Sequence, residues 1–217
     1  MLIGIVGFIG SGKGAASDIL VKDYSYTKVS FADSLKDAAS NIFGWSRHLL
    51  EGDTIESRDF RETIDSFWSS KFGYDVSPRK VLQTLGTESC RDIFHENIWI
   101  FSVEKKIEAF QDVVIPDVRF PNEIDFIKSK GGIVIRVVRG KDPEWYDTAY
   151  RHNTEGLFEM YRKYPDIHFS EWAWIGQKFN HVIENEGTLE KLSQDIKNIL
   201  QSHKVSSIIR KSSMINK

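Results

Sequence analysis

Hydrophobic residues along the chain follow two patterns, which together predict a parallel α/β fold. Short, nearly continuous apolar runs are typical of strands buried on both faces of a parallel sheet. Such runs predict strands at residues 1–6, 26–31, 113–115, 133–138 and 181–183. Apolar residues at helical spacing predict helices at 15–24, 33–43, 121–129 and 189–200. We therefore expect a three-layer α/β/α domain with a five-stranded parallel sheet.

Two long excursions interrupt this alternation. Residues 44–112 contain no convincing strand, and their pattern predicts helices at 57–71, 78–85, 87–94 and 96–110. Because a crossover between parallel strands needs only about a dozen residues, the excess predicts a helical substrate-binding insertion at about 45–110. The aromatic and charged region at about 141–179 follows the fourth strand, where a lid could close over phosphates. The core then comprises 1–44, 111–140 and 180–202, and 203–217 is expected to be a basic, frayed tail.

The first predicted strand leads directly into a glycine-rich loop. Residues 7–13 read G-x-x-x-x-G-K, and a helical pattern follows, which is the context in which this motif binds phosphate. Glycines let backbone N–H groups turn inward, the helix adds the positive end of its dipole, and Lys13 would reach the outer phosphates of a nucleotide. Gly14 and Ala15 stand where the usual motif has a hydroxyl for Mg²⁺. The alternative is a strand that ends in a purely structural glycine turn.

Polar side chains at the ends of the second and third strands suggest a second part of the site. Asp117 follows an apolar run, as in enzymes that place a carboxylate near Mg²⁺ and phosphates, and Arg119 lies two residues further on. A structural ion pair is the alternative. Arg79 and Gln83 share one helical face next to a predicted helix break at Gly86, and suit a phosphate and a base edge. Like Lys36, they are equally compatible with an ordinary solvated helix surface.

Composition and the absence of certain motifs argue against several other classes of protein. The 29 basic and 31 acidic residues nearly balance, so nucleic acid is not the favoured partner. The single cysteine excludes an internal disulfide framework. With no apolar run of roughly 18 residues and no basic leader, we expect a cytoplasmic protein without a membrane partner. The sequence also lacks H-E-x-x-H, G-x-S-x-G and N-K-x-D motifs, which argues against a zinc site, an α/β-hydrolase and a GTPase.

Taken in order, the motifs resemble those of the phage deoxynucleoside monophosphate kinases, from residue 3 to about 200. The resemblance implies phosphoryl transfer from ATP to a deoxynucleoside monophosphate, in the host cytoplasm if a phage encodes the chain. The motifs that carry it are G-x-x-x-x-G-K at 7–13, F-A-D-S-L-K-D at 31–37, L-Q-T-L-G-T at 82–87, P-D-V-R at 116–119 with Glu123, and N-E-G-T at 185–188.

The resemblance also implies roles for individual residues. Lys13, Asp117 and Arg119 would be catalytic, together with a lid arginine, which could be Arg139, Arg151 or Arg162. Asp117 would hold hydrated Mg²⁺ through water or orient the acceptor sugar. The loop residues would cradle ATP: Gly10, Ser11, Gly12, Lys13, Gly14 and Ala15. The acceptor pocket would contain Lys36, Arg79, Gln83, Gly86, Thr87, Trp99, Asp117, Arg119 and Glu123.

Other functions remain open at this point. Dephospho-coenzyme A kinases and adenylate kinases share the expected architecture, and a non-catalytic ATP-binding module would share the glycine loop. Trp99 is equally compatible with a core position. The sequence does not rank the acceptor bases, and it leaves the oligomeric state undecided, with a homodimer as one alternative.

Overall fold

A five-stranded parallel sheet forms the centre of the molecule. The computed structural model describes residues 1–215, with side chains described through His203. The strands lie in the order β2-β3-β1-β4-β5, and every neighbouring pair is parallel. Their bounds are β1 (Leu2–Val6), β2 (Thr27–Lys28), β3 (Val113–Ile115), β4 (Ile133–Val138) and β5 (His181–Glu184). The predicted parallel sheet is confirmed, although β2 is shorter than the sequence suggested.

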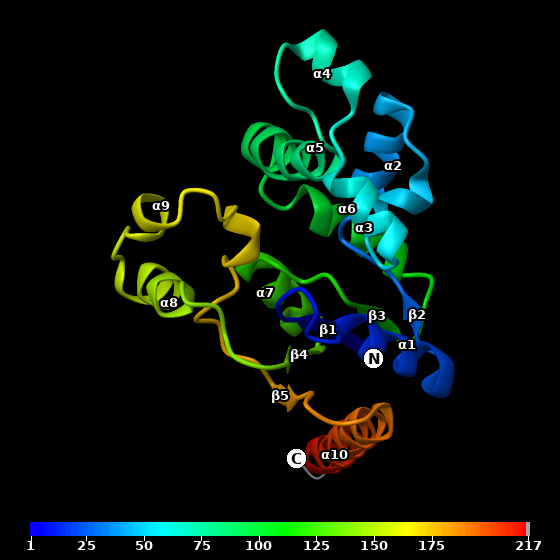
Figure 1. Ribbon diagram of the computed structural model, residues 1–217. Helices are drawn as coiled ribbons and strands as arrows, with labels where there is room; N and C mark the ends of the chain where they lie inside the picture. The colour runs from blue at the N-terminus through cyan, green and yellow to red at the C-terminus, as the bar shows by residue number, and fades with distance from the viewer. Residues whose placement is uncertain (216–217) are drawn as a thin grey trace.

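Helices cover both faces of the sheet, as Figure 1 shows. Because side chains alternate along a strand, β1 sends Ile3 and Ile5 into one core and Leu2 and Val6 into the other. Helices α1 (Lys13–Tyr24) and α10 (Leu189–Ile215) pack on the first face. On the second face lie α2 (Asp33–Phe43), α6 (Ile98–Ile107) and α7 (Pro121–Ser129). The three-layer α/β/α architecture is therefore confirmed.

The insertion between β2 and β3 is helical throughout, as predicted. It contains η1 (Arg47–Leu50), α3 (Ile55–Glu62), α4 (Ser66–Phe72), α5 (Pro78–Thr84) and η2 (Leu85–Phe94), and ends in α6. The single helix expected at 57–71 is wrong, because the chain breaks between α3 and α4. Asp65 causes the break: its carboxylate caps α4 by accepting the Trp68 N–H at 3.0 Å, and it also accepts the indole N–H of Trp45 at 2.7 Å.

The predicted helix break at Gly86 is also wrong. Gly86 lies inside the π-helical segment η2, which continues α5 without interruption. A side chain at this position would approach Leu35 of α2 to 2.9 Å, so glycine permits close helix packing here. The indole N–H of Trp99 donates a hydrogen bond to the Gly86 carbonyl at 2.9 Å, so the buried indole nitrogen has a partner.

The region between β4 and β5 packs onto the same hydrophobic core as the second face of the sheet. It contains α8 (Tyr146–Glu155), α9 (Met160–Lys163) and η3 (Phe169–Glu171). Met160, Trp172 and Trp174 are almost fully buried, and the Trp174 ring lies 4.9 Å from that of Phe8 in the glycine loop. This lid-like segment therefore packs directly against the loop, and in Figure 1 it lies across from the helical insertion. Its closure over a ligand stays a prediction.

Helix α10 continues beyond the end predicted for it. It runs to Ile215, whereas the sequence suggested a helix to residue 200 and a frayed tail from 203. Residues 201–215 contain neither glycine nor proline, so no residue there interrupts the helix. Residues 216 and 217 of the predicted tail lie outside the described part of the chain. Across residues 1–215, none of the helices combines the length and apolar character needed to cross a membrane.

The C-terminal end of β5 supports the glycine loop. Asn185 is buried and its amide Nδ2 donates to the Ser11 carbonyl at 2.9 Å. Gly12 has a φ of 101°, and the Asn185 amide occupies the space that a side chain at this position would need. The last strand therefore fixes the loop that follows the first.

Replacing Asn185 with alanine should lower the free energy of unfolding by about 1–3 kcal/mol, because the buried Ser11 carbonyl loses its donor. Urea denaturation measures this change. The matched control is Asn198→Ala on the exposed face of α10, for which we expect a change within about 0.5 kcal/mol. Equal effects of the two substitutions would contradict a supporting role for Asn185.

Candidate active site

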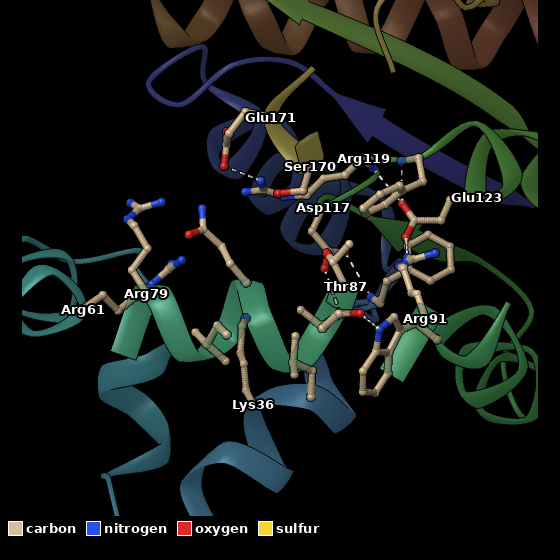
Figure 2. Close-up of a pocket in the computed structure, with 18 of the residues that line it drawn as sticks. Lys36, Arg61, Arg79, Thr87, Arg91, Asp117, Arg119, Glu123, Ser170 and Glu171 are labelled. Carbon is tan, nitrogen blue, oxygen red and sulfur yellow. Dashed lines mark hydrogen bonds and ion pairs between the residues drawn. The ribbon is translucent and has the colours of Figure 1, made fainter. Parts of the chain in front are cut away.

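A cavity of about 180 Å³ opens between the insertion, the end of β3 and η3 (Figure 2). Both the helical insertion and the lid-like segment contribute to its wall, so chain segments far apart in sequence meet there. Its lining is Phe31, Ala32, Leu35, Lys36, Glu51, Arg61, Arg79, Leu82, Gln83, Gly86, Thr87, Arg91, Trp99, Asp117, Arg119, Phe120, Glu123, Ser170 and Glu171.

Every residue predicted for the acceptor pocket lines this cavity. Helix α2 supplies Lys36, and α5 supplies Arg79 and Gln83 on the shared face that their spacing predicted. The other predicted residues come from η2, α6 and the segment after β3: Gly86, Thr87, Trp99, Asp117, Arg119 and Glu123. The structure thus brings these side chains together, while their roles stay predictions.

The glycine loop has the left-handed backbone that the motif requires. Gly10 and Gly12 have φ values of 79° and 101°, a region that other residues rarely adopt. The Lys13 ammonium donates to the carbonyls of Gly7 and Phe8, each at 2.7 Å. Burial, followed by the nearby Arg119 charge, lowers the pKa of Lys13 to about 8. A bound anion would favour the charged form of this amine.

The hydroxyl that is missing after Lys13 has no substitute in the loop. Gly14 is exposed, and a side chain there would meet open space. Ser17, one turn further along α1, is fully buried and its hydroxyl faces away from solvent without a partner among the described residues. The loop therefore offers phosphates backbone N–H groups, one ammonium and the buried Ser11 hydroxyl, which has no partner among the described residues, but no oxygen-bearing side chain directly after Lys13.

Three arginines gather at one end of the cavity. Arg79 pairs with Glu62, and Arg119 donates to a Glu171 oxygen at 2.6 Å. Arg61 reaches the cavity from α3, as Figure 2 shows. Burial lowers its pKa to about 10, and the charges of Arg79 and Arg119 add to the effect. These guanidinium groups repel one another, and a multiply charged anion between them would offset that repulsion.

Sequence reasoning missed Arg61 and Glu171. Arg61 lies in a strongly charged helix together with Arg58, which is exposed. Nothing in the sequence indicates which of the two arginines points into the cavity. Glu171 lies far from the other site residues along the chain, in the lid-like region. Burial alone would raise its pKa, but the Arg119, Arg79 and Lys13 charges together outweigh burial and leave the pKa below the ordinary value.

Asp117 joins the end of β3 to the start of α2. Its carboxylate accepts the Ser30 hydroxyl at 2.5 Å and the N–H groups of Phe31 and Ala32 at 3.1 and 3.0 Å. Both carboxylate oxygens are therefore engaged within the protein. A metal could contact Asp117 directly only by competing with these donors.

The other end of the cavity contains a buried ion pair. Glu123 accepts hydrogen bonds from Arg91 and from the N–H groups of Arg119 and Phe120, the latter two at 2.7 and 3.1 Å. The Arg91 guanidinium lies 3.9 Å from the centre of the Phe120 ring. Burial raises the pKa of Glu123 to about 7, although Arg91 acts in the opposite direction. Glu123 thus fixes the backbone that carries Arg119.

Two of the predicted catalytic residues, Lys13 and Arg139, do not line the cavity. Arg139 follows β4 and is exposed, and its side chain has no hydrogen-bond or ion-pair partner among the side chains described, those of residues 1–203. Lys36, in contrast, lines the cavity and pairs with Glu51 at 2.6 Å. A catalytic role for Arg139 stays a prediction that requires movement of the segment that follows it.

A phosphate-binding loop on the first strand of a five-stranded parallel sheet, next to a cationic cavity, defines a P-loop kinase architecture. Comparison with known proteins narrows the class. Residues 48–196 match the family model for deoxynucleotide monophosphate kinase. Because this match covers more than half of the chain, the protein belongs to the deoxynucleotide monophosphate kinase family.

Two viral relatives have descriptions of the same family. A protein of Acanthamoeba polyphaga mimivirus, described as a deoxynucleotide monophosphate kinase, is 36% identical over 153 residues, covering 64% of this chain and 74% of its own. The deoxynucleoside-5′-monophosphate kinase of Escherichia phage T5 is 29% identical, with 59% and 72% covered. Among solved structures, shikimate kinase from Aquifex aeolicus superimposes with a TM-score of 0.45 at 16% identity, over 94% of this chain and 99% of its own.

Replacing Glu123 with alanine should destabilise the protein by about 3–5 kcal/mol, because Arg91 would remain buried without its partner. Thermal or urea unfolding measures the loss. Glu186→Ala removes an exposed carboxylate and serves as the control, with an expected change within about 0.5 kcal/mol. A Glu123 variant as stable as this control would show that the pair contributes nothing to the fold.

Proposed function

We propose that this protein transfers the γ-phosphoryl group of ATP to the 5′-phosphate of a deoxynucleoside monophosphate, giving ADP and a deoxynucleoside diphosphate. The observation that supports this most strongly is the cluster of Arg61, Arg79 and Arg119 in one cavity, with Lys13 of the glycine loop near enough to Arg119 for the two charges to interact, in a chain of the deoxynucleotide monophosphate kinase family. The cluster joins a donor-phosphate loop to a site for a second anion.

The donor ATP binds at the glycine loop in this proposal. The N–H groups of residues 10–15 surround its phosphates, and α1 directs the positive end of its dipole toward them. Lys13 leaves the carbonyls of Gly7 and Phe8 and contacts the outer phosphates. The Phe8 ring in this loop contacts the Trp174 ring, so ATP bound at the loop would lie next to the lid-like segment.

The acceptor binds in the cavity with its phosphate at the arginine end. Arg61, Arg79 and Arg119 offer paired N–H donors of the kind that match phosphate oxygens. The nucleoside then extends toward Gln83, Thr87 and Trp99, where the wall combines polar groups with aromatic surface. The indole nitrogen of Trp99 is occupied by Gly86, so this side chain contributes its ring face and not a hydrogen bond.

The chemistry requires positioning and charge stabilisation more than a base. The acceptor is already a phosphate oxygen, so no strong base is needed to activate it, and the protein must align two phosphates in line. Lys13 and Arg119 neutralise charge on the transferred group. Closure of residues 141–179 would exclude water and bring exposed cations, Arg139 among them, toward the phosphates.

The residues of this site suit Mg²⁺ only in an outer-sphere role. In the part of the chain that the structure describes, no three His, Cys, Asp or Glu side chains are grouped so that they could hold a metal. Gly14 provides no side-chain oxygen, and the oxygens of Asp117 are engaged. Mg²⁺ commonly keeps several waters and binds substrate phosphates. Asp117 would then contact it through water, and the metal would supply charge neutralisation on the phosphates.

The partners in this proposal are small nucleotides in the cytoplasm. A release assay for ADP tests the function directly, with a panel of deoxynucleotides, ribonucleotides and dephospho-coenzyme A as acceptors. Stimulation by a deoxynucleoside monophosphate is the expected result. Stimulation only by dephospho-coenzyme A, or by no acceptor, would contradict the proposal. Size-exclusion chromatography with light scattering decides between monomer and homodimer.

Replacing Lys13 with alanine should reduce kcat on the order of 10²- to 10³-fold or more, because the transferred phosphoryl group loses its ammonium partner. The circular dichroism spectrum and melting temperature should remain those of the parent protein. Lys22→Ala, an exposed lysine on the same helix, is the control and should retain full activity. Near-normal turnover by the Lys13 variant would exclude the proposed use of the loop.

Replacing Arg61 with alanine should raise KM for the acceptor by about 10- to 100-fold, the effect of losing a charged hydrogen bond of about 1.5–3 kcal/mol. KM for ATP should stay unchanged, because Arg61 belongs to the acceptor side. Arg58→Ala, in the same helix but exposed, should alter neither constant. If the Arg61 substitution changed only the KM for ATP, Arg61 would belong to the ATP site, and its assignment to the acceptor site would be wrong.

A further inference from the structure

The Glu171 carboxylate lies among the cations that are proposed to bind phosphate. It accepts a hydrogen bond from Nη1 of Arg119 at 2.6 Å. The charges of Arg119, Arg79 and Lys13 all lower its pKa, and the side chains of Arg79 and Arg119 line the same cavity as Glu171. In Figure 2, Glu171 enters from the side opposite Arg61 and Arg79, and a dashed line joins it to Arg119.

At the end of the cavity that contains Arg61, Arg79 and Arg119, the positive charges outnumber the carboxylates that pair with them. Arg79 pairs with Glu62, and Arg119 pairs with Glu171. Arg61 has only a 3.4 Å hydrogen bond to the Glu51 carbonyl, and its buried Nε has no partner among the described residues. Within this cluster, therefore, unused N–H donors and uncompensated charge remain for an incoming anion.

A phosphate bound to these arginines would compete with Glu171 for the same guanidinium group. Carboxylate and phosphate oxygens both accept charged hydrogen bonds from arginine with similar geometry. Two anions close together in a partly buried site repel each other. Arg119 therefore has to release Glu171, at least in part, before a phosphate can use the same N–H groups.

We propose that Glu171 is a resident counter-ion that occupies the position of the acceptor phosphate in the empty protein and is displaced when the acceptor binds. The proposal rests on the function proposed above. In the empty state the carboxylate offsets the repulsion among Lys13, Arg79 and Arg119 and keeps Arg119 oriented toward the cavity. Glu171 is thus a positioning residue that tunes acceptor affinity.

The location of Glu171 links this exchange to the lid-like segment. Glu171 ends η3, which His168 caps by accepting the Ser170 N–H at 3.2 Å. The same imidazole contacts Glu88 of η2 at 3.1 Å. The short η3 turn therefore contacts both Arg119 and the helical insertion. Displacement of Glu171 would move the segment that is expected to close over the phosphates.

The test compares anion binding by the full-length protein and its Glu171→Gln variant. Glutamine keeps the shape and an acceptor oxygen but removes the charge. Isothermal titration with inorganic phosphate, and separately with the deoxynucleotide that best supports ADP release, should show binding tightened by about tenfold or more. In kinetic assays KM for the acceptor should fall while KM for ATP stays constant.

The control is Glu159→Gln, which removes a partly exposed ion pair between Glu159, just before α9, and Lys163 of α9, and should leave phosphate binding unchanged. Weaker or unchanged phosphate binding by Glu171→Gln would overturn the proposal. A lower kcat together with a higher KM for the acceptor would also overturn it, because Glu171 would then hold Arg119 in place in the liganded protein as well. If that variant does not fold, Glu171→Asp replaces it. Its shorter carboxylate retreats from Arg119, so binding should again be tighter than in the parent protein, and weaker binding would overturn the proposal.

The inorganic phosphate titration separates this proposal from the proposed function. If no deoxynucleotide stimulates ADP release, the kinase assignment fails, but the difference in phosphate affinity between the parent protein and Glu171→Gln still decides the role of the carboxylate. If deoxynucleotides are phosphorylated and Glu171→Gln binds phosphate no more tightly, the kinase assignment stands and the counter-ion proposal fails.

Discussion

The site depends on two carboxylates that follow β3 and accept hydrogen bonds from backbone N–H groups. Asp117 holds the turn that begins α2, and Glu123 holds the turn that carries Arg119. Each carboxylate thereby fixes a chain segment that lines the cavity. Cations can be gathered in one place only when the backbone beneath them is held, because their repulsion would otherwise separate them.

Much of the architecture could be predicted because it depends on local pattern. The bounds of β4 and α7 follow directly from an apolar run and from the proline and glycines that flank the helix. The phosphate loop is equally local, since its glycines and Lys13 lie within a few residues of one another. Arg79 and Gln83 could be placed on one face by spacing alone, although only the resemblance to a family made them members of a site.

The remaining features depend on contacts between distant parts of the chain. Gly86 suggested a helix end, but its close approach to Leu35 and the hydrogen bond from Trp99 keep the helix intact. Arg61 and Glu171 reach the cavity from the insertion and from the lid-like segment, and the sequence has no local signal for either encounter. Helix α10 extends beyond residue 200 although the apolar pattern weakens there, because no glycine or proline interrupts it before Ile215.

The π-helical geometry of η2 has a consequence for the shape of the cavity. In a π-helix residues five apart stack along one side, whereas in an α-helix they are separated by roughly 140°. Gly86 and Arg91 are five apart, and both line the cavity. The wide helical turn therefore lets one helix present a bare backbone surface and a guanidinium group on the same wall. The hydrogen-bond register of this segment shapes the cavity as much as the identities of its side chains do.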